Sequence, residues 1–302
     1  MRTALPLLLV TASLLCVPVA MALNEYGIEG MGVVATRAGE GRATITPDGQ
    51  RIVFASDRSG GAGGWDLWQA DLRDGRWQDA RPLPFNTDGD ELDPWFSHDG
   101  QWLLFASRRG GRLALFRAAV HRDGTLGVPE PLAGADAGRD PGGGERGPAL
   151  SPDGRWLLFS RDAGAGRGWD LHVAPMQDGQ RGAAVALEAL NTPADETDGD
   201  WTGNPCGILF SRTGDAGGQV WQSACAWRDG DTQPLALSFN RAEGMTGQPV
   251  VDASKPTELL LVSDAARAPR AGSTDVYRMA LPRQDTVAGC VPHAARAVDS
   301  AR

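Results

Sequence analysis

A short pattern of polar and apolar positions recurs along the chain. Each copy has a turn with Gly, Asp or Pro, followed by an apolar segment that ends on Ser or Arg. The copies are TPDGQRIVFAS (46–56), SHDGQWLLFAS (97–107), SPDGRWLLFSR (151–161), TGNPCGILFSR (202–212) and a shorter version, KPTELLLVS (255–263). The apolar anchors Phe54, Phe105, Phe159, Phe210 and Leu261 are 51, 54, 51 and 51 residues apart. A nearly constant period of this size indicates one supersecondary unit repeated about or along an axis.

Each repeat is predicted to form four short strands. In the first copy these are 43–46, 51–56, 65–72 and 81–85, separated by the turn 47–49, the glycine-rich link 60–64 and the turn 74–75. Turn signals at this density, without helical periodicity, indicate an all-β architecture. Four-stranded units of this size around an axis are typical of propeller blades.

The ends of the chain are expected to close the ring. The last copy supplies only three strands, 248–251, 258–263 and 275–281, while the lone apolar segment 32–36 precedes the first repeat. Pairing this segment with the last copy would remove two open sheet edges. The sequence therefore predicts a β-propeller of five four-stranded blades with the N-terminal strand closing the last blade. The alternative is six blades, with 24–33 contributing part of one.

The two termini are expected to lie outside the propeller. Residues 1–22 combine Arg2, an apolar stretch too short to cross a bilayer and the small-x-small sequence Ala20-Met21-Ala22. This combination predicts a secretory signal peptide. The propeller is assigned to 23–282, and 283–302, rich in Ala and Arg, is expected to be a disordered tail. No later apolar run is long enough for a transmembrane helix.

Three cysteines remain after export: Cys206, Cys225 and Cys290. The predicted strands 207–212 and 219–227 form a hairpin if the chain turns near Ala216, which places residue 206 one step from Cys225. An oxidising compartment then favours a disulfide between Cys206 and Cys225. The alternative is a pair of unpaired buried thiols. Cys290 in the tail is either free or competes for one of these two cysteines.

The formal net charge of −9 argues against a nucleic-acid partner, which would require a basic surface. It fits a soluble protein that repels other anions. The protein is expected to be a monomer whose partner is an envelope protein or peptide.

The repeat resembles that of TolB-type propellers. The resemblance is carried by the pattern SxDGxxLxFxS, followed by a glycine-rich link and WDLW or WDLH, and it covers about residues 40–281. It implies a propeller fold and a periplasmic location at the envelope of a Gram-negative bacterium. TolB itself has a small α/β domain before its propeller, whereas these repeats begin almost at the predicted cleavage site, so a stand-alone propeller is expected. The repeat serves many roles, so it does not by itself define a function.

A carboxylate recurs ahead of the anchors. Four copies have a Glu fourteen residues before the aromatic anchor, and the fifth has Gly247 there. In one interpretation each Glu accepts hydrogen bonds from backbone N–H groups or from an arginine of the neighbouring blade and joins the blades. In the other, a ring of carboxylates at the channel rim attracts a metal ion or a cationic peptide. Repetition favours the structural interpretation, because every blade needs a joint.

Two acidic loops and two tryptophans are further candidates. Oxygen-rich segments around Asp88, Asp90, Asp198 and Asp200 suggest weak calcium sites, although neither has EF-hand spacing, and solvated loops are the favoured interpretation. Trp102 and Trp156 occupy one repeat position and Trp65 and Trp169 another, and aromatic residues at repeat positions are expected to pack between blades. Trp95 and Trp201 lie beside the acidic loops and are expected to line a site. The candidate binding residues at the rim are Glu40, Glu91, Asp93, Trp95, Glu145, Glu196, Asp198 and Trp201.

No catalytic residue is assigned and no cofactor is expected beyond the calcium option. The sequence has no G-x-S-x-G elbow, and its four histidines do not cluster with cysteines. The predicted function is non-catalytic binding of a protein or peptide at the bacterial cell envelope. The alternative is a carbohydrate-active enzyme, similar to glycoside hydrolases, that uses Glu91, Asp93 and Glu196 at the channel mouth.

Overall fold

The computed structural model describes residues 33–132, 134, 144–203, 206–228, 230, 232–264, 272–283, 287 and 290. The predicted signal peptide and most of the predicted tail lie outside these residues. The described chain contains strands, turns and bends but no helix. No described segment could therefore cross a membrane as a helix.

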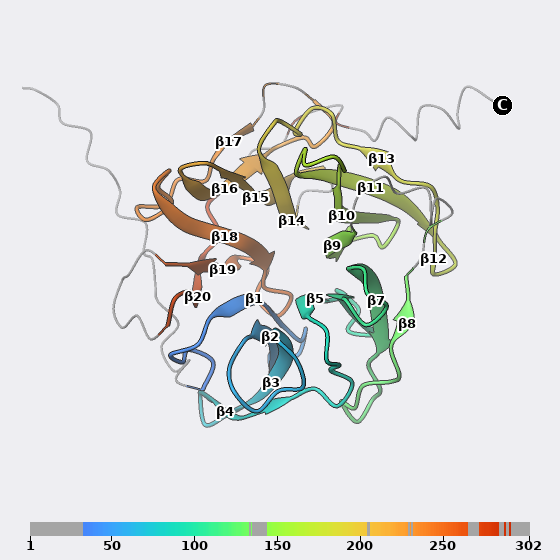
Figure 1. Ribbon diagram of the computed structural model, residues 1–302, viewed down its shortest axis with the longest axis vertical. Helices are drawn as coiled ribbons and strands as arrows, with labels where there is room; N and C mark the ends of the chain where they lie inside the picture. The colour runs from blue at the N-terminus through green and yellow to red at the C-terminus, as the bar shows by residue number, and fades with distance from the viewer. Residues whose placement is uncertain are drawn as a thin grey trace, which may run out of the picture.

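The strands form five consecutive antiparallel groups arranged around a central axis (Figure 1). Group I contains β1 (Glu40–Ile45), β2 (Arg51–Ser56), β3 (Asp66–Arg73) and β4 (Arg76–Pro82). Group II contains β5 (Glu91–Phe96), β6 (Trp102–Ser107), β7 (Ala114–Ala119) and β8 (Glu130–Pro131). Group III contains β9 (Glu145–Leu150), β10 (Trp156–Asp162), β11 (Trp169–Gln177), β12 (Gln180–Arg181) and β13 (Val185–Ala186).

Group IV contains β14 (Asp195–Trp201), β15 (Ile208–Gly214), β16 (Gly217–Ser223) and β17 (Thr232–Pro234), and group V contains β18 (Gly244–Val251), β19 (Glu258–Ser263) and β20 (Asp275–Ala280). A short parallel pairing of β16 with β18 joins groups IV and V into one sheet. The first strand of each group lies nearest the axis, and these strands begin on the face seen in Figure 1, which we call the mouth face. The all-β prediction is confirmed, whereas the number of blades stays a prediction.

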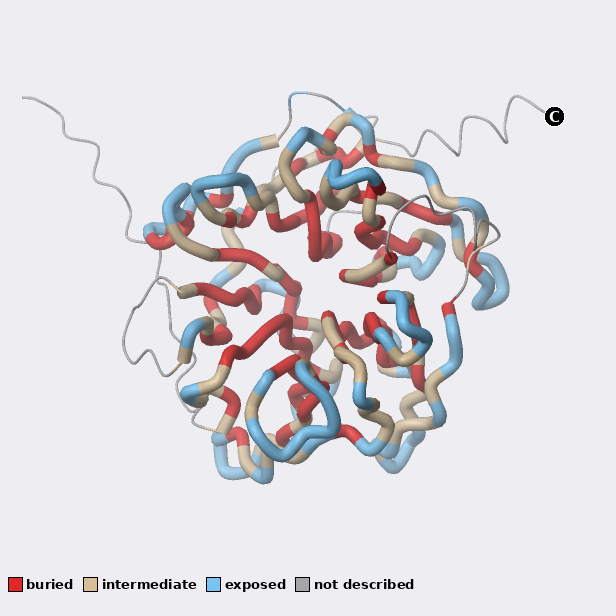
Figure 2. Tube along the Cα trace, in the orientation of Figure 1, coloured by how far each residue is buried: buried red, intermediate tan, exposed pale blue. Residues whose placement is uncertain are grey.

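Burial follows the sequence pattern. The anchors Phe54, Phe105, Phe159 and Phe210 are fully buried, and Leu261 is nearly so. Buried positions line the inner strands around the axis, and exposed positions lie on the outer loops (Figure 2). The repeated apolar segment is therefore the central element of each group, packed on both faces.

The prediction that the segment 32–36 forms a strand that closes the last blade is wrong for its described residues, 33–36. Residues 33–36 form a turn and a bend, and group V has three strands among the described residues. The carbonyls of Val33 and Val34 instead accept hydrogen bonds from Arg58, so they are not available for a β ladder. Contact between the chain ends is made by Glu40, whose N–H donates to the carbonyl of Thr274 at 3.1 Å and whose carbonyl accepts from the Thr274 hydroxyl at 2.9 Å.

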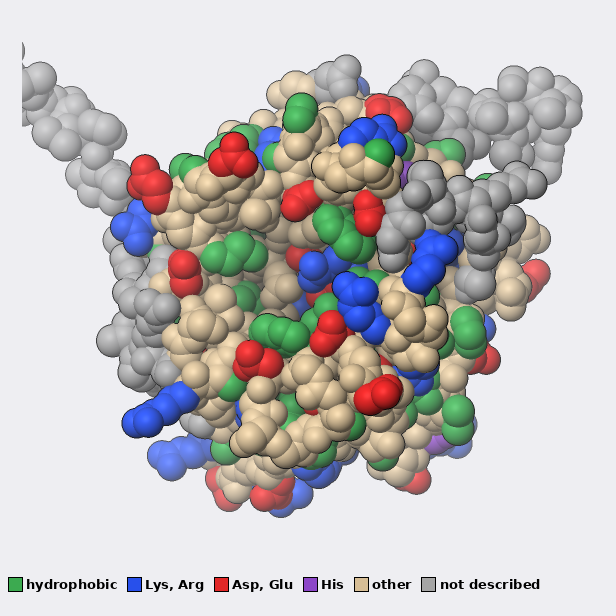
Figure 3. All heavy atoms as spheres, viewed as in Figure 1, with side chains coloured by type: hydrophobic (Ala, Val, Ile, Leu, Met, Phe, Trp, Pro, Cys, Tyr) green, Lys and Arg blue, Asp and Glu red, His purple; other side chains and the backbone are tan. Residues whose placement is uncertain are grey.

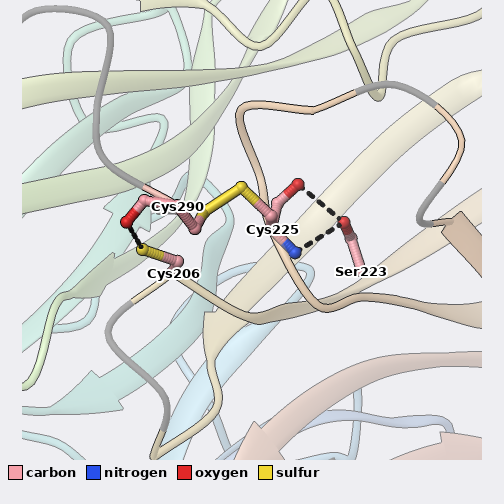
Figure 4. The surroundings of a disulfide bond; sticks show 4 residues. All are labelled: Cys206, Ser223, Cys225 and Cys290. Atoms are coloured by element: carbon pink, nitrogen blue, oxygen red, sulfur yellow. Dashed lines mark hydrogen bonds between the residues drawn. A yellow bond between two sulfur atoms is a disulfide. The ribbon is translucent and has the colours of Figure 1, made fainter. Parts of the chain in front are cut away.

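The predicted disulfide pairing is also wrong. Cys225 is bonded to Cys290 in the predicted tail (Figure 4). The N–H of Ala226 donates to the carbonyl of Cys206 at 2.9 Å, so residue 206 does lie one step from Cys225, as expected. Both cysteines lie outside the strands, Cys206 before β15 and Cys225 after β16, so the register of the hairpin does not determine which way their side chains point. The Cys206 thiol donates to the carbonyl of Cys290 at 2.9 Å, and burial raises the pKa of this thiol.

Candidate binding site at the channel mouth

The recurrent glutamates are buried joints at the start of the inner strands. Glu91 is fully buried and accepts hydrogen bonds from the N–H and hydroxyl of Thr87, both at 2.7 Å, and from the Ser107 hydroxyl at 2.6 Å. Arg109 approaches the same carboxylate at 3.6 Å. Thr87 lies in the linker that arrives from group I. The carboxylate therefore fixes this linker to group II.

The same arrangement occurs at Glu40 and Glu196. Thr36 and Thr192 supply the N–H and hydroxyl donors, and Arg58 and Arg212 supply the cations. Burial raises the pKa of Glu40, although the hydrogen bonds from Thr36 and the charge of Arg58 act in the opposite direction.

The arginines that contact the glutamates differ in one detail from the prediction that each glutamate joins two blades. Arg58, Arg109 and Arg212 belong to the same group as the glutamate that each contacts, not to the neighbouring group. Each also donates to a carbonyl of the arriving linker, for example Arg109 to Phe85 and Arg212 to Leu190. In each of these groups the glutamate therefore accepts hydrogen bonds from the arriving segment, and the arginine donates to a carbonyl of the same segment.

Groups III and V depart from this pattern. Glu145 is held by two arginines of its own group, Arg161 at 2.6 Å and Arg181 at 2.7 Å. In group V the residue opposite Ser263 is Thr246, not Gly247, and the two hydroxyls are 2.8 Å apart. The sequence alignment was one residue off here because the β18–β19 hairpin is one residue longer than the others.

A second ring of residues lies two positions after the glutamates, where each inner strand has a β-bulge. Asp93, Gly147, Asp198 and Gln248 have positive φ values of 54°, 63°, 54° and 55° at this bulge. A Cβ atom on Gly147 would lie 3.0 Å from backbone atoms of Asp198, so glycine is favoured here by this close approach, since Asp and Gln adopt the same φ in the other groups.

Arg146 of group III bridges carboxylates from two other groups. Its Nε and Nη2 donate to the two oxygens of Asp93 at 2.9 and 3.0 Å, and Nη2 also reaches Asp198 at 3.3 Å. The N–H of Gly147 adds a bond to Asp93 at 3.1 Å. Burial alone would lower the pKa of Arg146, but the charges of Asp198 and Asp93 outweigh it and raise this pKa. Burial raises the pKa of Asp198.

Below this bridge, Asp200 joins three groups. Its carboxylate accepts from the Trp95 indole at 3.0 Å, the Trp201 N–H at 2.9 Å and the Val251 N–H at 2.7 Å. Burial raises the pKa of Asp200. Trp95 and Trp201 are only 1 % exposed, so they fill the interior around the axis and do not present an aromatic surface at the mouth.

Arg42 occupies the bulge position of group I and was missed by the sequence analysis. Its side chain is fully buried and its Nη2 donates to the carbonyl of Gly199 in group IV at 3.0 Å. The sequence did carry a signal for it, since Arg42 follows Glu40 by the same two residues that separate Asp93 from Glu91.

The calcium candidates are not brought together. Asp88 is exposed, and Asp90 pairs with Arg108 at 3.2 Å. The oxygens of Asp198 and Asp200 accept the hydrogen bonds described above. Within the described residues, no group of three or more His, Cys, Asp or Glu side chains is placed to hold a metal ion.

Acidic and basic side chains therefore lie together around the central opening of the mouth face, as Figure 3 shows. The arrangement joins the groups through charge-assisted hydrogen bonds and leaves Arg146 as the most exposed member of the central bridge, with 22 % of its side chain accessible.

Comparison with known proteins supports this fold. No family model matches the chain, and no curated protein matches it. Among solved structures, a putative TolB from Agrobacterium tumefaciens is similar with a TM-score of 0.52 and 14 % identity, covering 82 % of this chain and 91 % of that one. A thermostable family-43 glycoside hydrolase has a TM-score of 0.55 and 14 % identity, covering 87 % and 97 %. TolB from Acinetobacter baumannii has a TM-score of 0.46 and 16 % identity over 65 % of this chain, which spans only 43 % of that protein.

The two similarities with TM-scores above 0.5 support a TolB-like propeller fold and show no function. One of these neighbours is a putative TolB and the other a glycoside hydrolase, and both identities are 14 %.

Proposed function

We propose that this protein is an exported TolB-like propeller of five blades, the five strand groups, that binds a protein or peptide at the bacterial cell envelope without catalysis. The proposal includes a periplasmic location, a monomeric state and no resident cofactor. The binding surface is the mouth face around the Asp93–Arg146–Asp198 bridge.

One observation carries the choice of binding over hydrolysis. A glycosidase needs one carboxyl group that donates a proton and a second that faces the sugar. Here both oxygens of Glu91, Glu196, Asp93 and Asp198 already accept hydrogen bonds from the chain itself. Carboxylates held in this way serve as joints, so the carbohydrate-active alternative has less support.

The proposed function is tested by capture from an envelope extract with the mature protein. Charge reversals on the mouth face, Asp88→Arg with Asp215→Arg, should abolish capture of the specific partner because both residues are exposed beside the mouth. The matched control makes the same change in charge on the opposite face, Asp74→Arg with Asp123→Arg, and should leave capture intact. Equal capture by both folded double variants would contradict a mouth-face binding surface.

A further inference from the structure

A cavity of about 510 Å³ lies beside the channel mouth, between groups III and IV. It is lined by the backbone of the glycine-rich β10–β11 loop, the half-buried Trp169 and the carboxylates of Asp162 and Asp195. Gly164, Gly166 and Gly168 supply no side chains to fill it. This volume is within the range of small-ligand and side-chain pockets.

Group I contains the same Trp-Asp motif, and the comparison shows what differs in group III. In group I, the N–H of Trp65 donates to Asp90 at 3.2 Å, and Arg108 neutralises this carboxylate at 3.2 Å. In group III, the N–H of Trp169 donates to Asp195 at 2.9 Å. The residue opposite Asp195, however, is Thr213 instead of an arginine. Within the described residues Asp195 has no ion-pair partner.

The second aspartate of the motif differs in the same way. Asp66 in group I is buried and accepts hydrogen bonds from the N–H groups of Ala62 and Gly63 in its own loop. Asp170, its equivalent, makes no such bond to its loop in the described part of the chain. Burial raises the pKa of Asp170, although the charges of His172 and Arg167 act in the opposite direction. Arg167 of the same loop and Arg146 of the bridge act on Asp170 and Asp195 through their charges, but within the described residues neither arginine forms an ion pair with these carboxylates. The Arg167 side chain donates instead to the carbonyl of Ala163.

Trp169 already contacts a cation on the channel side. The guanidinium of Arg146 lies 6.0 Å from its ring centroid, and the same ring lines the cavity. Gly41 occupies the position in group I that Arg146 occupies in group III. A Cβ atom built on Gly41 would lie only 3.3 Å from the Trp65 ring, so the Trp65 ring packs on the backbone of Gly41 and not on an arginine. An aromatic ring and a carboxylate without an ion-pair partner form the kind of site that binds an ammonium or guanidinium group.

We propose that this cavity binds an arginine or lysine side chain of the partner peptide, with Trp169 stacking on the cation and Asp195 pairing with it. This inference rests on the proposed peptide-binding function and names the chemistry that the partner must carry.

The test uses the mature protein and a defined probe, the peptide acetyl-Gly-Ser-Arg-Ser-Gly-amide, followed by NMR titration of the tryptophan indole N–H signals. Trp169→Phe assigns the Trp169 signal. We expect this signal to shift on binding. We also expect the same peptide with citrulline, the neutral isostere of arginine, to bind at least about fivefold more weakly.

Asp195→Asn should weaken binding of the arginine peptide by about the same factor, while its amide oxygen still accepts the Trp169 N–H. Asp90→Asn, the matched change in group I, should leave affinity within about twofold. Equal affinity for the arginine and citrulline peptides, or an unchanged affinity in Asp195→Asn, overturns the inference. Because this assay needs no natural partner, a negative result here with intact envelope capture rejects the cavity but not the proposed function.

Discussion

The glutamate joints predict a large loss of stability for a minimal change. In Glu91→Gln the side chain keeps its shape but loses its charge, and one of its acceptor oxygens becomes an N–H donor that faces other donors. Three hydrogen bonds of 2.6–2.7 Å reach this fully buried carboxylate from Thr87 and Ser107. A hydrogen bond to a charged group contributes about 1.5–3 kcal/mol, and breaking a buried charged network costs about 3–5 kcal/mol. We therefore expect Glu91→Gln to lower the free energy of unfolding by about 3–5 kcal/mol.

Glu130→Gln is the matched control in the same group. Glu130 pairs with Arg117 at 2.6 Å, but 52 % of its side chain is exposed. A surface pair of this kind contributes at most about 1 kcal/mol. Urea unfolding followed by circular dichroism and tryptophan fluorescence gives both values. If the two variants differ by less than about 1 kcal/mol, the glutamates are not joints and the argument from repetition fails.

Three further predictions concern other contacts. Burial would raise the pKa of Asp71, but hydrogen bonds from Arg51 and Arg81 outweigh it and lower this pKa. Asp71→Asn should therefore lower the free energy of unfolding by about 1 kcal/mol at pH 7. Urea unfolding at several pH values should show this difference between variant and original protein vanish as the pH falls through the lowered pKa. Cys225→Ser, which opens a disulfide with a sequence separation of 65 residues, should cost about 4 kcal/mol, and a reductant should then have no further effect on unfolding. Trp95→Phe leaves Asp200 without its indole donor and should cost about 1–3 kcal/mol by thermal or urea unfolding, whereas a cost near zero would contradict a structural role.

Local patterns explain what the sequence predicted well. The segment 51–56 was predicted as a strand and forms β2 with the same bounds. A turn with Pro and Gly precedes it, and its consecutive Ile, Val and Phe side chains point alternately to the two faces of the sheet, where they are buried. The recurrent glutamates were found by spacing alone, and the favoured structural interpretation agrees with their burial and hydrogen bonds.

The failures concern contacts between segments far apart in sequence. The apolar residues Val33 and Val34 suggested a strand, but the guanidinium of Arg58 takes their carbonyls. Cys290 lies in a segment without strand signals, so nothing in its surroundings marked it as the partner of Cys225. Arg146 has no repeat equivalent that would reveal its bridge between Asp93 and Asp198. Such contacts depend on how the groups meet around the axis, which local periodicity does not encode.

The disulfide also determines how the folded protein would bear mechanical load. Cys225 follows β16 of group IV, and Cys290 follows group V, so β17 and all three strands of group V belong to a covalently closed loop. A force applied to the two chain ends passes through the sulfur–sulfur bond and bypasses β17, β18, β19 and β20. In an optical-trap experiment group V should therefore add no extension while the disulfide is intact, and its full contour length should appear only after reduction.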